Sequence, residues 1–226
     1  MKAPYPSDLE RTADMLVMVI GGHDTTGYAL AWTLIEVAKH PHVYEKIKEE
    51  MRTVLEKDTQ IIDIANASKL QYLDWVIKEA LRLRPSAGFG TGRLATEQFH
   101  YNGYDFPKGA LLFLPIFPLM RAGIKVCINC LFLVLNDVIQ DADSFVPERW
   151  SEDNPEKDRL KELFLPFAVG KRNCVGQSLA TLELKVAAAN LLKKFRFELV
   201  NADVKAEWYL TYKPADVRMQ IIEDEL

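Results

Sequence analysis

A single cysteine lies between two glycines in the stretch PFAVGKRNCVGQSLA, and its setting favours a stable thiolate. Cys174 immediately precedes a helical pattern that opens at Gly176, and the N–H groups at a helix start stabilise negative charge. A shielded thiolate of this kind is a strong axial ligand for haem iron. Phe167 would offer a flat ligand an apolar face, and Arg172 would offer its anionic edge a cation. The alternative is a structural cysteine in a glycine-containing loop.

A second group of chemically interesting residues interrupts an apolar helical pattern, in MLVMVIGGHDTTGYALAWTLIEVA. Each glycine there costs roughly 1 kcal/mol relative to alanine, so we expect a compensating role. Gly21 and Gly22 would let a planar ligand press against the helix. Thr25 can bond the carbonyl one turn back and, with Asp24, widen the helix locally. The alternative is a buried helix with a glycine packing face.

The cysteine motif Phe167-x-x-Gly170-x-Arg172-x-Cys174-x-Gly176 resembles the haem-binding signature of the cytochrome P-450 family, the haem-thiolate monooxygenases. All of its fixed positions match that signature. The resemblance implies haem b (iron protoporphyrin IX) as the cofactor, with Cys174 as the axial ligand of its iron. It also implies that Phe167, Gly170, Arg172 and Gly176 contribute to haem binding.

The segment Gly21-Gly22-His23-Asp24-Thr25-Thr26 resembles the long distal helix of the same family. The resemblance places Gly21 and Gly22 beside the haem. It also implies that Asp24 and Thr25 form an acid–alcohol pair that supplies protons for dioxygen chemistry. His23 occupies the variable position of the pattern, and we interpret it as an ordinary helix residue.

A third pattern, Glu79-Ala80-Leu81-Arg82, places a carboxylate and a guanidinium one turn apart on one helix face. Such pairs are also common on surface helices. In the family the pair is buried and engages the arginine of a Pro-Glu-Arg segment, which is present here as residues 147–149. The resemblance therefore implies a structural ion-pair triad of Glu79, Arg82 and Arg149. It also aligns Arg93 with an arginine that meets a haem propionate, and a surface arginine at a strand start is the alternative.

The elements that must position these residues are predicted to be mainly α-helical with a small antiparallel β-sheet, the partial cytochrome P-450 fold. Ser7 with Glu10 predicts the start of a long helix that ends near Lys39. Further helices are predicted over residues 42–56, 67–83 and 176–194. Strands are predicted within residues 92–115, 195–200 and 208–222, with turns at Asn102-Gly103 and Pro107-Lys108-Gly109.

Composition narrows the possible classes. The chain has 226 residues, about half of them apolar, which is enough for a substantial core. Its net charge of −4 gives no electrostatic footprint for nucleic acid, and three cysteines are too few for a disulfide scaffold. No apolar run reaches the ~18 residues of a membrane span, and no signal segment is recognisable. The sequence thus leaves the localisation of this chain unknown, while a full-length eukaryotic relative is expected at the endoplasmic reticulum membrane.

Two departures from the family pattern define the predicted domain. The resemblance covers only the C-terminal half of a family member, so residues 1–226 are predicted to be one partial domain without the N-terminal half. Joining Arg121 to Asn136 would restore an ordinary family sequence, so we predict that residues 122–135 are an insertion from a retained intron or a gene-model error. The Cys127-x-x-Cys130 pair inside it has no second pair to complete a zinc site, and we interpret it as incidental.

By this resemblance the function is that of a haem-thiolate monooxygenase. It would use O2 and electrons from a redox partner, such as a flavoprotein reductase, to hydroxylate or epoxidise a small apolar organic substrate. Lys171 beside the cysteine is a candidate contact for that partner, and a solvated lysine is the alternative. Two other classes stay open: a truncated haem-binding remnant without turnover, and a non-binding helical product of a fragmentary gene.

Overall fold

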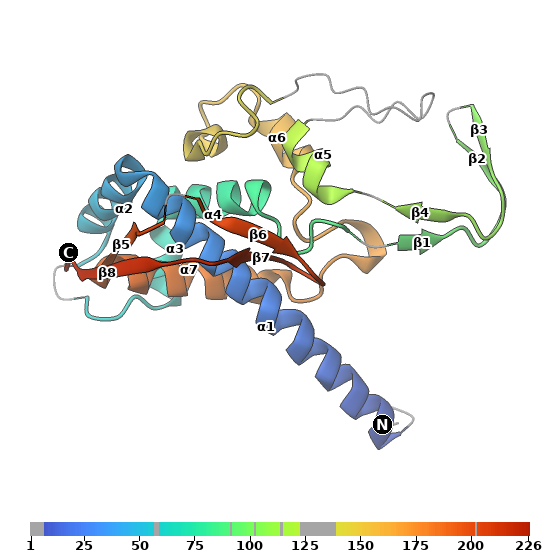
Figure 1. The fold of residues 1–226 in the computed structure, drawn as a ribbon, viewed down its shortest axis with the longest axis horizontal. Coiled ribbons are helices and arrows are strands. Elements are labelled where there is room, and N and C mark those ends of the chain that lie inside the picture. Colours follow the sequence, from blue (N-terminus) through green and yellow to red (C-terminus); the bar gives the residue numbers. More distant parts are fainter. Residues whose placement is uncertain are drawn as a thin grey trace.

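The computed structural model describes residues 7–56, 59–90, 92–101, 103–113, 115–122, 139–201 and 203–226. Helices dominate these residues, and the strands form small two-stranded antiparallel sheets (Figure 1). This architecture confirms the predicted fold class. The predicted insertion, including Cys127 and Cys130, lies outside the described residues except for Ala122.

The long helix α1 (Asp8–Lys39) begins as predicted. The Ser7 Oγ accepts a hydrogen bond from the Glu10 N–H at 3.2 Å, which satisfies one of the unpaired donors of the first turn. The helix is α-helical from end to end, so the predicted local widening at Asp24 and Thr25 is wrong. The Thr25 hydroxyl bonds the Gly21 carbonyl without displacing the helical ladder. The N-terminal part of α1 projects away from the rest of the protein (Figure 1).

The next helices differ from the prediction at one point. α2 (Pro41–Val54) is the predicted second helix, but the predicted helix over residues 67–83 is two helices, α3 (Ile64–Lys69) and α4 (Gln71–Leu83). They break at Leu70, which is extended and fully buried. The new start of α4 is capped from α2, because the Glu50 carboxylate accepts hydrogen bonds from the backbone N–H groups of the second and third helical residues of α4.

The main core lies where α2, α4, α7 (Gln177–Lys194) and the C-terminal part of α1 pack together. Each fully buried aliphatic side chain there contributes about 1.5–3 kcal/mol. Representative fully buried residues are Ile47, Met51, Leu73, Val76 and Leu192. The remaining short helices are α5 (Ile116–Ala122), η1 (Pro147–Trp150), α6 (Lys157–Leu163) and η2 (Gly170–Arg172).

The strands pair as four antiparallel ribbons: β1 (Gly92–Leu94) with β4 (Leu111–Phe113), β2 (Phe99–Tyr101) with β3 (Tyr104–Phe106), β5 (Phe195–Leu199) with β8 (Met219–Glu223), and β6 (Lys205–Trp208) with β7 (Tyr212–Ala215). The predicted turn before β4 forms, because the Ala110 N–H donates to the Pro107 carbonyl at 3.1 Å. Gly109 has a φ of +86°, which favours glycine. Asn102 of the other predicted turn lies outside the described residues.

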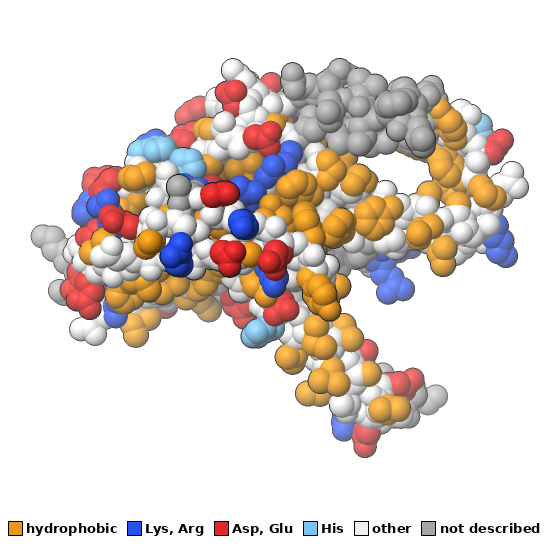
Figure 2. Space-filling model, viewed as in Figure 1, with side chains coloured by type: hydrophobic (Ala, Val, Ile, Leu, Met, Phe, Trp, Pro, Cys, Tyr) orange, Lys and Arg blue, Asp and Glu red, His pale blue; other side chains and the backbone are white. Residues whose placement is uncertain are grey.

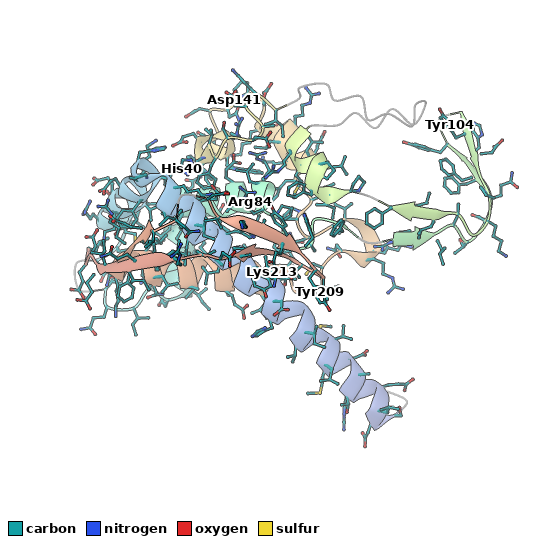
Figure 3. All side chains as sticks on the ribbon, in the orientation of Figure 1. His40, Arg84, Tyr104, Asp141, Tyr209 and Lys213 are labelled. Carbon is teal, nitrogen blue, oxygen red and sulfur yellow. The ribbon has the colours of Figure 1, made fainter. Side chains whose placement is uncertain are left out.

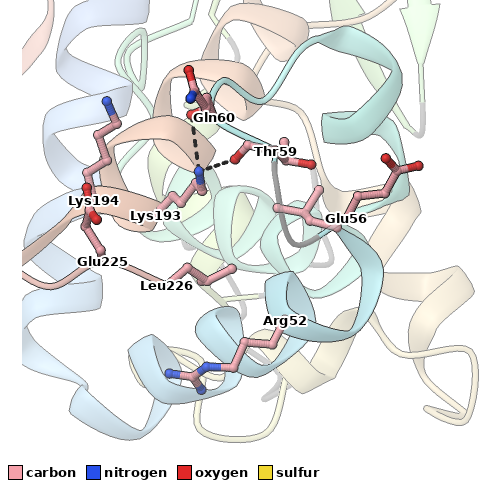
Figure 4. Close-up of a pocket in the computed structure, with 9 residues that line it drawn as sticks. Arg52, Glu56, Thr59, Gln60, Lys193, Lys194, Glu225 and Leu226 are labelled. Atoms are coloured by element: carbon pink, nitrogen blue, oxygen red, sulfur yellow. Dashed lines mark hydrogen bonds between the residues drawn. The ribbon is translucent and has the colours of Figure 1, made fainter.

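A cavity of about 890 Å³ opens where the ends of α2 and α7 meet the C-terminal tail (Figure 4). Lys193 donates there to the backbone carbonyls of Thr59 and Gln60, which fixes the loop before α3. The lining that the structure describes includes no residue of the predicted haem site. Within the described ranges, no helix is both long and apolar enough to cross a membrane.

Candidate active site around Cys174

The loop that carries Cys174 is closed by its own backbone. The Cys174 N–H donates to the Phe167 carbonyl at 2.9 Å, and the Asn173 N–H donates to the Gly170 carbonyl at 3.1 Å. Gly170 has a φ of +80°, so this position needs a glycine. Gly176 has a φ of −88°, and a side-chain carbon added there would lie 3.9 Å from the Cys174 Sγ, an ordinary contact. The loop therefore depends on the first glycine more than on the second.

The thiol of Cys174 is free and exposed, and it sits just before the start of α7. Gly176 is the N-cap of this helix and gives it no side-chain cap, so the first N–H groups of the helix face the loop. Their partial positive charge favours an anion at the position of Cys174. The arrangement leaves the Cys174 sulfur accessible to a ligand.

Several exposed side chains close to Cys174 in the sequence are apolar, beside the exposed Lys171 and Arg172. Val169 and Leu179 are each 60% exposed and Val175 is 79% exposed, while Phe167 packs partly buried against the main core. Exposed aliphatic side chains that flank a cysteine in the chain are suited to cover a flat, largely apolar ligand. A cysteine sulfur with apolar neighbours is a donor set that can hold haem, so these residues would fit that group.

The predicted distal residues lie on the projecting part of α1. Gly21, Gly22 and Asp24 are exposed, and Thr25 is the first residue along the helix that is partly buried. The Thr25 hydroxyl donates to the Gly21 carbonyl at 2.6 Å. His23 Nδ1 lies 2.9 Å from Asp24 Oδ1, a contact that the sequence interpretation of His23 did not include. Side-chain carbons added at the two glycines would meet nothing within 4 Å, so this surface is open in the chain.

The surroundings of these residues are also apolar. Six consecutive side chains of α1, residues 15–20, are each between 56% and 66% exposed, and all are aliphatic or Met. Figure 2 shows hydrophobic side chains along the projecting helix. Six consecutive residues point in all directions around a helix, so a single covering face cannot bury them.

The three residues of the predicted triad meet in a buried cluster. Arg82 donates from Nε and Nη2 to the two carboxylate oxygens of Glu79, both at 2.9 Å, and Arg149 Nε donates to Glu79 Oε1 at 3.2 Å. Trp150 Nε1 adds a hydrogen bond to the same carboxylate at 3.1 Å. The Glu79 side chain is fully buried, so these donors replace the water that the charge has lost. Trp150 was missed, although it directly follows the Pro-Glu-Arg segment.

The same cluster holds the two ends of the chain that flank residues 123–138. Arg82 Nη1 donates to the Met120 carbonyl at 3.2 Å and to the Ala142 carbonyl at 2.6 Å. Arg121 adds an ion pair between the same two flanking segments, because its Nη1 lies 3.0 Å from Asp143 Oδ1. Burial and the nearby Arg84 guanidinium lower the pKa of Arg121. The described residues before and after this segment are therefore fixed side by side.

The predicted cationic residues lie on separate elements. Arg93 is on β1, where its Nη1 donates to the Gly92 carbonyl at 3.0 Å, and Arg172 lies exposed in η2 next to Lys171. Arg172 is two residues from Cys174, close enough in the chain to serve the same ligand. Among the described residues, no cluster of His, Cys, Asp and Glu could hold a metal ion by itself.

Comparisons with known proteins identify the family of the chain. The sequence model of the family described as cytochrome P450 matches residues 2–211. The chain is 33% identical over 94% of its length to tabersonine/lochnericine 19-hydroxylase of Catharanthus roseus. It is 32% identical over 84% of its length to cytochrome P450 3A15 of Cavia porcellus, and 31% identical over 84% to cytochrome P450 4d2 of Drosophila melanogaster. The matches cover 38%, 35% and 35% of these relatives, so the chain spans little more than a third of their length. The chain belongs to the cytochrome P450 family.

Proposed function

We propose that this chain is the haem-thiolate part of a monooxygenase, with Cys174 as the axial ligand of haem b. The observation that carries the proposal is the loop itself. It presents a free, exposed thiol before a helix start, among exposed aliphatic side chains. Family membership supports the same reaction type, since one of the relatives is named a hydroxylase.

The residues that would hold the haem each have a definite chemistry. The Cys174 thiolate supplies the charge-bearing ligand, and Phe167 with its exposed aliphatic neighbours supplies apolar contact. Arg172 and Arg93 would pair with the carboxylates at the edge of the haem. When bound, the haem supplies the activation of O2 and the transfer of one oxygen atom to an apolar substrate.

On the face of the haem opposite Cys174, Asp24 and Thr25 would bring protons to the site. The Thr25 hydroxyl donates its proton to the Gly21 carbonyl, and its oxygen can accept a hydrogen bond from a water molecule. Asp24 contacts His23, and both side chains are more than half exposed, so the pair is open to water. Delivery of protons one at a time, with bulk water kept away, is what oxygen activation requires.

The partners follow from the same assignment. A flavoprotein reductase would deliver electrons at the face around Cys174, where Lys171 and Arg172 are exposed cations that can meet an acidic partner. The substrate would be a small apolar organic molecule. We also propose that the full-length protein works at the endoplasmic reticulum membrane.

A second function is favoured by a specific observation. The Asp24 side chain is 51% exposed and open space surrounds Gly21 and Gly22, so this chain alone leaves the proton-handling side in contact with water. A chain in this state would bind haem as a remnant without productive turnover. Both functions use Cys174 as the ligand of the haem. They differ in whether the bound haem transfers oxygen to a substrate.

The absorption spectrum of the reduced, CO-bound protein tests the proposal. A long-wavelength Soret band is expected in the wild type and in Cys127→Ser, and its loss is expected in Cys174→Ser. A short-wavelength band in the wild type would mean haem without a thiolate, and no band would mean that the chain does not bind haem. Turnover with a reductase then separates the enzyme from the remnant.

A further inference from the structure

Ser86 joins two elements at the base of the projecting helix. It follows α4 by three residues, and it is only 7% exposed. Its Oγ donates to the Thr25 carbonyl of α1 at 2.8 Å, and its own carbonyl accepts from the Tyr212 N–H of β7 at 2.8 Å. A buried hydroxyl that bridges two elements fixes their relative position more strictly than apolar packing does.

The contact falls at a special place along α1. Every residue from 7 to 24 is exposed, and Thr25 is the first that is not. The Ser86 hydroxyl therefore contacts α1 directly after its exposed segment. This N-terminal part of the helix projects from the rest of the protein in Figure 1. On the N-terminal side of Thr25, the described residues of α1 include no buried side chain.

The surroundings of Ser86 are rigid. Tyr212, which the Ser86 carbonyl holds, also accepts a hydrogen bond at its own carbonyl from Trp32 Nε1 at 3.0 Å. Its hydroxyl accepts from Arg84 at 3.1 Å, and Arg84 lies in the centre of the molecule in Figure 3. Arg84 in turn contacts Glu36 of α1 at 3.2 Å. The hydroxyl of Ser86 is thus presented to α1 from a fixed frame.

We propose that Ser86 is a positioning residue for Thr25. In an α-helix the Thr25 carbonyl already accepts the N–H of Ala29, so the Ser86 hydroxyl is a second donor to it. This second bond fixes the rotation of α1 about its axis at Thr25, and with it the direction of the side chains of Asp24 and Thr25. The catalytic meaning of this contact rests on the proposed function, while the contact itself does not.

Ser86→Ala isolates the hydroxyl, because the Ser86 carbonyl and its bond to Tyr212 remain. Ser68→Ala is the matched control: Ser68 Oγ donates to the Ala65 carbonyl at 2.7 Å, but both residues are exposed and belong to the same helix, α3. We expect an upfield shift of the Thr25 carbonyl ¹³C resonance in Ser86→Ala. We also expect roughly 3- to 10-fold faster hydrogen exchange at the Ala29 amide, the factor that one net hydrogen bond represents. Neither signal should move in Ser68→Ala.

A second measurement distinguishes a specific effect of Ser86 on Thr25 from a general loss of rigidity in the protein. In haem-loaded protein with a reductase, Ser86→Ala should raise the fraction of electrons released as hydrogen peroxide. The substitution should add nothing further in a Thr25→Ala background if it acts through Thr25. Additive effects would overturn the proposal, and so would an unchanged Thr25 carbonyl resonance. A shifted resonance in a protein that shows no turnover would contradict the proposed monooxygenase activity and leave the positioning contact standing.

Discussion

Two Glu-x-x-Arg pairs in this chain have the same spacing and opposite surroundings. Arg82 is 1% exposed and donates to fully buried Glu79, whereas Arg52 is 50% exposed and lies 3.6 Å from exposed Glu49. Replacing either arginine by methionine removes a guanidinium from the same position of an i,i+3 pair. The comparison tests whether burial gives the predicted triad its structural role.

The expected magnitudes follow from what each arginine holds. Arg82 donates to both oxygens of Glu79 and to the backbone carbonyls of Met120, Ala142 and Ser144. Arg82→Met leaves a buried carboxylate without its main partner, which costs about 3–5 kcal/mol. At about 2–4 °C per kcal/mol for a chain of this size, the midpoint of thermal unfolding should fall by roughly 6–20 °C. Arg52→Met should change stability by no more than about 0.5 kcal/mol.

Thermal and urea unfolding followed by far-ultraviolet circular dichroism measures both variants. Arg82→Lys should lie close to Arg82→Met, because an ammonium cannot reproduce the fork of donors that spans Glu79 and the carbonyls. If Arg82→Met unfolds at the same midpoint as Arg52→Met, the buried cluster does not stabilise the fold and the reasoning is refuted.

Two further predictions concern other parts of the fold. Burial, followed by the charge of Glu148 and the hydrogen bond to it, raises the pKa of Tyr72 above its ordinary 10.0. The unfolded chain therefore releases this proton first, and the free energy of unfolding should fall as pH rises above about 10. Urea melts at about pH 9 and about pH 11 should show a smaller fall in Tyr72→Phe, and an equal fall would contradict the assignment. Deletion of residues 122–135 should keep the unfolding midpoint within a few degrees, because Arg82 and the Arg121–Asp143 contact hold the flanking chain. A lost unfolding transition would show that the segment belongs to the fold.

Local signals in the sequence predict local structure well. Ser7 and Glu10 mark the start of α1, and the turn at Gly109 follows from its residue types. The break between α3 and α4 was missed because it depends on Glu50, twenty or more residues away, which caps the second helix. The widening of α1 was predicted from residue types that bend helices in some settings, but here the threonine bond runs alongside an intact ladder.

In the candidate site, too, local features were predicted and long-range contacts were missed. The types and spacing of the residues around Cys174 and in the Glu-x-x-Arg helix identify the cysteine loop and the ion-pair cluster. Contacts across the chain, such as Ser86 with Thr25 and Trp150 with Glu79, leave no periodic mark in the sequence, because each is a single polar atom placed by tertiary packing.

X-ray absorption at the iron edge of the haem-loaded protein tests the central claim most directly. If Cys174 is the axial ligand, the spectrum of the wild type contains one sulfur neighbour of the iron, and the spectrum of Cys127→Ser is the same. In Cys174→Ser the sulfur contribution is replaced by nitrogen or oxygen. A wild-type iron with only nitrogen and oxygen neighbours, or a sulfur neighbour that persists in Cys174→Ser, would contradict the account.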